Sequence, residues 1–188
     1  MSTGFWTRYR ITYASYLPLI TRNLVGAPDL IVESIVPRSG IVTVTIRNAG
    51  PQTVVDRFWV DLYVDPSPPP TEVNQTWPDL GAPGLVWYIS TPALPMLAGE
   101  ALVLTVGDPY YQPDYSHVEW PLDYGAAIYV QVDSFDAGTH HGAVAEGHEL
   151  TGGPYNNISG PVLVTPGEGS VPPDAGVLVP VDQIPPRP

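Results

Sequence analysis

Proline is the residue that most restricts the folds open to this chain. The 188 residues include 24 prolines and 18 glycines, which are spread along the chain instead of being gathered in one linker. Proline lacks a backbone N–H and clashes with the preceding helical turn, so this density argues against long helices. No window sustains apolar residues at the i, i+3, i+4 and i+7 positions of a helix, whereas several windows alternate with period two. The sequence therefore predicts an all-β protein.

Alternation and turn signals divide the middle of the chain into about seven strands, which we expect to pack as two sheets. The clearest segment begins at Val54, from which apolar side chains fall on one face as far as Val64. Turn-forming sequences such as Asn48-Ala-Gly-Pro51 separate the segments. The expected strands are residues 29–36, 41–48, 54–65, 85–89, 100–106, 126–133 and 158–165. The side chains expected in the core are Val44, Ile46, Phe58, Val60, Leu62, Val103, Ile128, Val130 and Val132.

The first 27 residues differ in charge from the rest of the chain. They contain three arginines and no acid, so their net charge is +3, which leaves −15 for the remainder of a chain whose net charge is −12. Alternation within this segment places six apolar side chains on one face of an extended strand: Phe5, Tyr9, Ile11, Tyr13, Leu17 and Leu19. About fifteen extended residues reach roughly 50 Å, which exceeds a typical sandwich strand. We expect an extended strand within residues 1–27, a sandwich over 28–165 and a proline-rich tail over 166–188.

Charge and composition exclude several classes of function. A chain with a net charge of −12 and no lysine repels phosphate backbones, so we expect no nucleic-acid partner. The chain has no cysteine, which excludes disulfides and thiolate metal sites. No stretch approaches the roughly 18–20 apolar residues of a membrane span. The N-terminus alternates with polar residues instead of forming one apolar run, so the signal of an exported protein would be missing from this numbering or unconventional.

Five pieces of residues 28–164 occur in a defined order along the chain. They are Pro28-Asp-Leu-Ile-Val32, Val42-Thr-Val-Thr-Ile-Arg-Asn-Ala-Gly50, Phe58-Trp-Val-Asp-Leu-Tyr-Val-Asp65, Leu97-Ala-Gly-Glu100, and Tyr129-Val-Gln-Val-Asp133 with the acids that follow it and Asn156-Asn157. In this order they resemble the CARDB family, the cell-adhesion-related domain of bacteria. The resemblance implies an immunoglobulin-like β-sandwich in an extracellular or cell-surface setting, and it supplies no active site. Insertions at residues 66–82 and 107–125, and the extra Gly152-Gly-Pro-Tyr155, depart from the family pattern.

The densest polar cluster lies before the last expected strand. Its members are Asp133, Asp136, His140, His141, Glu146, His148 and Glu149. Neither the two-histidine helix spacing of a zinc protease nor a twelve-residue calcium loop is present. We expect the carboxylates to accept backbone N–H groups in a structural turn, and therefore no metal or cofactor. The alternatives are a transition metal on imidazole and carboxylate, or calcium on a set of four acids: Asp133, Asp136, Glu146 and Glu149.

Catalytic signals are absent from the sequence. No Gly-x-Ser-x-Gly elbow occurs, and no glycine-rich loop leads into a helix that could bind phosphate. Nineteen acids make accidental carboxylate pairs inevitable, so their number does not indicate a hydrolase. We therefore expect that the protein is not an enzyme and has no catalytic residues.

Aromatic residues concentrate in and around the two insertions. Rings exposed together could form a flat platform for a surface glycan, because aromatic faces offer large rigid contact areas. The alternative is that they seal the long loops onto the sandwich or pack against a neighbouring subunit. The residues concerned are Trp77, Trp87, Tyr110, Tyr111, Tyr115 and Trp120.

Together these features predict a non-enzymatic adhesion or structural module at the bacterial surface. The N-terminal strand, with Arg8 and Arg10 beside its apolar residues, would add to the sheet edge of a neighbouring copy. Such head-to-tail contacts produce homo-oligomeric rings or filaments. The equal alternative is that the strand covers an edge of its own domain. The rival function is a carbohydrate-binding module that uses the loop aromatics.

Overall fold

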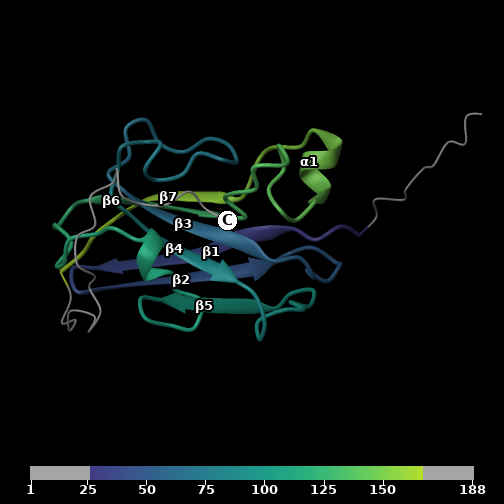
Figure 1. Ribbon diagram of the computed structural model, residues 1–188, viewed down its shortest axis with the longest axis horizontal. Helices are drawn as coiled ribbons and strands as arrows, with labels where there is room; N and C mark the ends of the chain where they lie inside the picture. Colours follow the sequence, from purple (N-terminus) through teal and green to yellow (C-terminus); the bar gives the residue numbers. More distant parts are fainter. Residues whose placement is uncertain (1–25, 167–188) are drawn as a thin grey trace, which may run out of the picture.

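The computed structural model describes residues 26–166 and confirms the all-β prediction (Figure 1). Helix within these residues is limited to the 3-10 turn η1 (Pro113–Tyr115) and the single-turn α1 (Gly147–Thr151). Seven strands make up the rest of the regular structure. They are β1 (Leu30–Arg38), β2 (Ile41–Asn48), β3 (Phe58–Val64), β4 (Gly84–Ile89), β5 (Ala101–Thr105), β6 (Ala127–Val132) and β7 (Ile158–Leu163).

The strands form two antiparallel sheets with the order of a Greek-key sandwich. One sheet runs β1-β2-β5 and the other β4-β3-β6-β7. The first, second and fifth strands thus share one sheet, and the third, sixth and seventh share the other, as in immunoglobulin-like sandwiches. The fourth strand pairs with β3 and not with β5. The β5 strand is consequently left as an edge of the three-stranded sheet.

The main core lies between the two sheets and is built from the alternating residues. Val44 and Ile46 of β2 are fully buried, as are Val60 and Leu62 of β3. Burying one such aliphatic side chain contributes roughly 1.5–3 kcal/mol, so these alternating sets hold the sheets together. Eight of the nine predicted core residues are buried, and the exception is Val103.

The prediction for Val103 is wrong, because this residue faces solvent with 57% of its surface exposed. Its pairing partner across the ladder is Thr45, whereas Leu104 pairs with Val44 and points into the core. The β5 sequence Ala-Leu-Val-Leu-Thr has apolar residues on both faces, so alternation alone could not choose between them. The register with β2 makes that choice.

The third strand begins later than predicted. The expected segment was 54–65, but β3 starts at Phe58. Val54 is buried and exchanges two backbone hydrogen bonds with Met96, at 2.9 and 3.0 Å. This isolated bridge holds the chain close to the turn that precedes β5.

The four-stranded sheet is covered on both of its faces. Every residue of β3 is buried, including Trp59 and Tyr63, which point away from the main core. A second apolar cluster forms on that outer face, where Trp77 of the 66–82 insertion packs with Val86. Gly84 permits this close approach, since a Cβ there would lie 2.3 Å from Cγ of Trp77.

The three-stranded sheet carries no such cover among the described residues. Its outer face presents the apolar side chains of Val36, Ile41 and Val103, all exposed. Threonines on β2 and β5 occupy the positions between them. This surface also carries the exposed Arg47–Glu33 ion pair, and it ends at β5, which Figure 1 shows at the margin of the molecule.

Candidate functional site

The predicted assembly residues lie outside the part of the chain that the structure describes. These residues are Phe5, Arg8, Tyr9, Arg10, Ile11, Tyr13, Leu17 and Leu19, and the tail from residue 167 onward is outside it as well. The surface that could receive them is described, because β5 lies within residues 26–166. Its edge is therefore the first candidate site.

The β5 edge has backbone groups that find no partner in the described part of the chain. The Asn48 N–H donates to the Glu100 carbonyl, so alternate β5 residues bond to β2 and those between them face outward. At the outward-facing Thr105, the N–H donates to Asp108 and the carbonyl accepts from the Trp87 indole. The outward N–H and C=O groups of Ala101 and Val103 bond to nothing in residues 26–166. An unpaired edge of this kind can accept another strand.

The opposite edge, at β4, is occupied by the second insertion. The Tyr88 N–H donates to the Tyr110 carbonyl, and the Gln112 N–H donates to the Val86 carbonyl, each at 2.9 Å. A further pair of backbone hydrogen bonds joins Gly84 to the same insertion. Residues 110–117 therefore cover the β4 edge much as an added strand would.

The aromatic platform needs correction, because three of its six rings are in the interior. Trp77, Trp87 and Tyr110 are buried, and Trp87 lies on β4 instead of in a loop. The indole N–H of Trp77 donates to the Tyr115 carbonyl at 3.1 Å, which fixes that ring inside. A ring packed on both sides has no face to offer a sugar. The remaining three, Tyr111, Tyr115 and Trp120, are half-buried.

The four acids of the calcium alternative accept separate backbone hydrogen bonds. Asp133 uses one oxygen for the Ala143 N–H and the other for the Val144 N–H, both at 2.8 Å. Asp136 accepts from Gly138 at 2.9 Å. The remaining two, Glu146 and Glu149, belong to the start of α1. The four carboxylates are not brought together as one ligand group.

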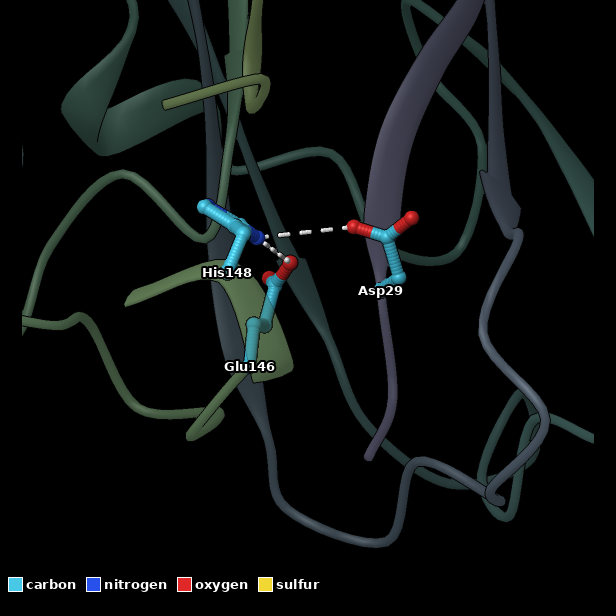
Figure 2. A group of neighbouring side chains, drawn as sticks. All are labelled: Asp29, Glu146 and His148. Carbon is cyan, nitrogen blue, oxygen red and sulfur yellow. Dashed lines mark ion pairs between the residues drawn. The ribbon is translucent and has the colours of Figure 1, made fainter. Parts of the chain in front are cut away.

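A different set of side chains does converge on one point (Figure 2). Glu146 and His148 come from the start of α1, and Asp29 from the residue before β1. The Nδ1 atom of His148 lies 3.5 Å from Oδ1 of Asp29 and 3.6 Å from Oε2 of Glu146. Among the described residues, this is the group whose ligand atoms lie close enough to hold a metal ion.

The local sequence explains why Glu146 and His148 are held in place. Glu146 is the N-cap of α1, and it forms a reciprocal capping box with Glu149. The turn ends at Gly152, whose φ of 72° is the left-handed conformation that glycine adopts at low cost. Capping orients Glu146 inward, where its Oε2 accepts the Leu30 N–H at 2.9 Å. This bond ties the start of β1 to the loop that leads into β7, and Figure 1 shows α1 beside the start of β1.

Burial dominates the electrostatics of this loop. Glu146 is fully buried, and desolvation raises its pKa to about 9 despite the hydrogen bonds from Leu30 and Asn157. Burial likewise raises the pKa of Asp133 to about 7, against the opposing effect of its two backbone donors. It also raises the pKa of Glu149 to about 7. Protonated carboxyl groups therefore persist here in neutral solution.

A surface pocket of about 370 Å³ opens beside the three side chains. Asp29 and His148 contribute to its wall together with Asn156 and neighbouring loop backbone. The Asn156 amide donates to Oδ1 of Asp29 at 2.9 Å. The pocket therefore gives a small solute or ion a route to the Asp29 side of the group.

Sequence reasoning identified Glu146 and His148 as members of a polar cluster but missed Asp29. Leu30, which follows Asp29, and Glu146 are 116 positions apart, and no spacing motif spans such a distance. The one available signal was the resemblance, which placed both segments at strand ends. His140 and His141, the other histidines of the predicted cluster, are exposed.

A scan against models of protein families, a search of curated proteins and a search of solved structures found no match. The resemblance to the CARDB family therefore stays a prediction. The fold itself is an all-β sandwich of two antiparallel sheets. No helix within residues 26–166 is both long and apolar enough to span a membrane.

Proposed function

We propose that this protein is a non-enzymatic structural module that assembles with copies of itself at the bacterial cell surface. In each contact, the N-terminal strand of one copy adds to β5 of the next. The observation that carries this proposal is the open edge at Ala101 and Val103, which has backbone groups available to a new strand. The surface setting rests on the resemblance to the CARDB family.

Charge supports the choice of occupant. The first 27 residues carry +3 and the rest of the chain −15. Glu100 directly precedes β5 in the sequence, and Asp108 lies three residues after its end. Both ends of the receiving strand therefore carry an acidic residue. Opposite charge steers association and orients the docking segment, here through Arg8 and Arg10.

Length supports addition to a second molecule. The β5 strand has five residues, which span roughly 17 Å, whereas the alternating segment reaches roughly 50 Å. The excess length can contact the apolar face beside the edge, where Val36, Ile41 and Val103 are exposed. Each of these side chains loses solvent contact in the assembled state, which favours association.

The experiment compares Val103→Pro with Val103→Thr in the full chain. The Val103 N–H points outward, so proline there leaves the ladder to β2 intact but removes the donor that an added strand needs. Sedimentation across protein concentration should show assembly for the wild type and for Val103→Thr. Val103→Pro should stay monomeric at concentrations at least tenfold higher, and circular dichroism should show that it is folded.

Two further measurements test which segment docks. A chain without residues 1–27 should be a folded monomer, and a peptide of those residues should bind it less tightly as salt increases. The same peptide should bind the Val103→Pro version at least tenfold more weakly. A wild type that stays monomeric at every concentration, or equal assembly of the two Val103 variants, would contradict the proposal.

A further inference from the structure

The group formed by Asp29, Glu146 and His148 plays no part in the assembly proposal. It combines one imidazole nitrogen with two carboxylate oxygens, contributed by segments far apart in the chain. A cation that binds here would displace the proton of the buried Glu146 carboxyl group. Two ionised carboxylates would then balance the charge of a divalent cation, and a mixed nitrogen and oxygen set suits transition metals. The donor types are therefore those of a compact metal site.

The two separations from His148 Nδ1 match those between ligands that share an ion, and all three atoms lie within 4.8 Å of one another. A tetrahedral metal with bonds near 2.1 Å holds its ligand atoms about 3.4 Å apart. The observed separations from His148 Nδ1 are 3.5 Å to Asp29 and 3.6 Å to Glu146. A hydrogen bond from nitrogen to oxygen is shorter, at about 2.7–3.2 Å. The geometry fits a shared cation better than direct hydrogen bonds.

The ring nitrogens of His148 lack hydrogen-bond partners. Both are buried, and neither forms a hydrogen bond within residues 26–166. Leaving buried polar atoms unsatisfied is costly. An ion bound to Nδ1 would supply the missing partner on the side that faces the two carboxylates. This orphaned nitrogen points to a ligand independently of the acidic residues.

Hydrogen bonds from neighbouring residues hold both carboxylates in place before any ion binds. Glu146 accepts the Leu30 N–H on Oε2 and the Asn157 amide on Oε1, each at 2.9 Å. Asp29 accepts the Asn156 amide at 2.9 Å. Donors of this kind orient metal ligands and are part of the architecture of metal sites.

We propose that Asp29, Glu146 and His148 bind a divalent transition metal ion of the Zn²⁺ type. The pocket beside Asp29 and His148 has room for a water molecule as a fourth ligand. Calcium is a poor fit, because it takes six to eight oxygen ligands and this site offers two carboxylates and a nitrogen. The ion would clamp the start of β1 to the α1 loop, at the point where the N-terminal segment joins the sandwich.

The test uses metal-stripped full-length protein and titrates Zn²⁺ and Ca²⁺ separately by calorimetry. Zn²⁺ should bind with one-to-one stoichiometry, and at a hundredfold excess over Kd it should raise Tm by about 5–10 °C. Ca²⁺ should leave Tm unchanged. His148→Gln and Asp29→Asn should each weaken Zn²⁺ binding at least tenfold. The double variant His140→Gln/His141→Gln removes the two exposed histidines and should bind as the wild type does.

His148 and Asp29 are used because Glu146 also supports the fold through Leu30. Circular dichroism and Tm in EDTA report whether each variant is folded before the metal is added. If the wild type binds no Zn²⁺, the three side chains form only an ion-paired cluster and the proposal is wrong. Equal binding by wild type and His148→Gln, or an equal stabilisation by Ca²⁺, would also overturn it.

Discussion

The two sheets of this sandwich share one core but differ in what covers their outer faces. The four-stranded sheet has apolar clusters on both sides, and both long insertions pack against it. The three-stranded sheet has a core on one side and, within residues 26–166, exposed valine, isoleucine and threonine on the other. Long loops often carry binding or catalytic residues. In this chain the two insertions instead cover the outer face and the β4 edge of the four-stranded sheet.

The difference shows where a partner could bind. On the closed sheet, Asp61 and Gln131 are fully buried, and their side chains bond within the protein. On the bare sheet, Arg47 forms an exposed ion pair with Glu33 at 3.0 Å, which contributes little to stability. Among residues 26–166, backbone N–H and C=O groups without a hydrogen-bond partner thus occur together with exposed apolar side chains on the three-stranded sheet.

Removing Trp77 should have the largest effect on stability. Trp77→Ala opens a cavity in the outer cluster of the closed sheet, and such truncations cost about 3–5 kcal/mol. The control on the bare sheet, Val103→Thr, should change the free energy of unfolding by less than about 0.5 kcal/mol. Urea unfolding followed by tryptophan fluorescence and circular dichroism measures both. Similar losses for the two variants would show that the sheets are not covered differently.

Raising the pH should destabilise the loop between β6 and β7, which contacts both sheets. The pKa values of Asp133 and Glu146 are raised to about 7 and about 9 in the folded state, from ordinary values of 3.8 and 4.5. As pH rises, the unfolded chain loses these protons before the folded chain does, so stability present below about pH 4 is lost through pH 9. The free energy of unfolding in EDTA should fall by a few kcal/mol between pH 5 and pH 8.

The variant Glu146→Gln isolates this effect. It removes one of the buried carboxyl groups, so the fall in stability between pH 5 and pH 8 should be smaller than in the wild type. Glu119→Gln removes an exposed carboxylate and is the matched control. If the free energy of unfolding falls equally with pH in all three proteins, the pH dependence arises from surface charge and not from Glu146.

Adding a methyl group at Gly84 should cost about 1–3 kcal/mol, because the new Cβ overlaps Trp77 and the Leu62 carbonyl. Gly138→Ala is the control, since a Cβ there meets only the Asp136 carboxylate at 3.4 Å. The penalty at Gly84 should shrink in a Trp77→Ala background, where part of the overlap is gone. Full additivity in the double-mutant cycle would mean that Gly84 does not make room for the indole.

Local patterns in the sequence predicted the strands well. Proline density excluded long helices, and alternation at Val44, Val60 and Val130 identified core-facing residues that are fully buried. Alternation works on these strands because side chains in a strand point to opposite faces in turn. The segment Leu97-Ala-Gly-Glu100, one of the pieces that resemble the CARDB family, forms a turn in which the Glu100 carboxylate accepts the Leu97 N–H and Gly99 has a φ of 78°.

Patterns failed where both faces of a strand carry apolar side chains. Trp59 and Tyr63 lie on the face of β3 opposite the predicted core residues, and the 66–82 insertion covers them. The insertion aromatics were considered for ligand contact, and Trp77 is instead a core residue. Propensity does not report whether a distant loop will fold over a sheet, because that depends on long-range packing.

The sequence by itself determined the class of fold and the alternation of apolar and polar side chains along the strands. It also determined the opposite charges of the N-terminal segment and the remainder. These properties depend on residue type and local order. Only the tertiary structure decided that Val103 faces outward, that β5 is an edge strand among the described residues, and that Asp29 lies beside His148. Each depends on strand register or on contacts between distant segments, and the free energy that selects them arises when the sheets pack together.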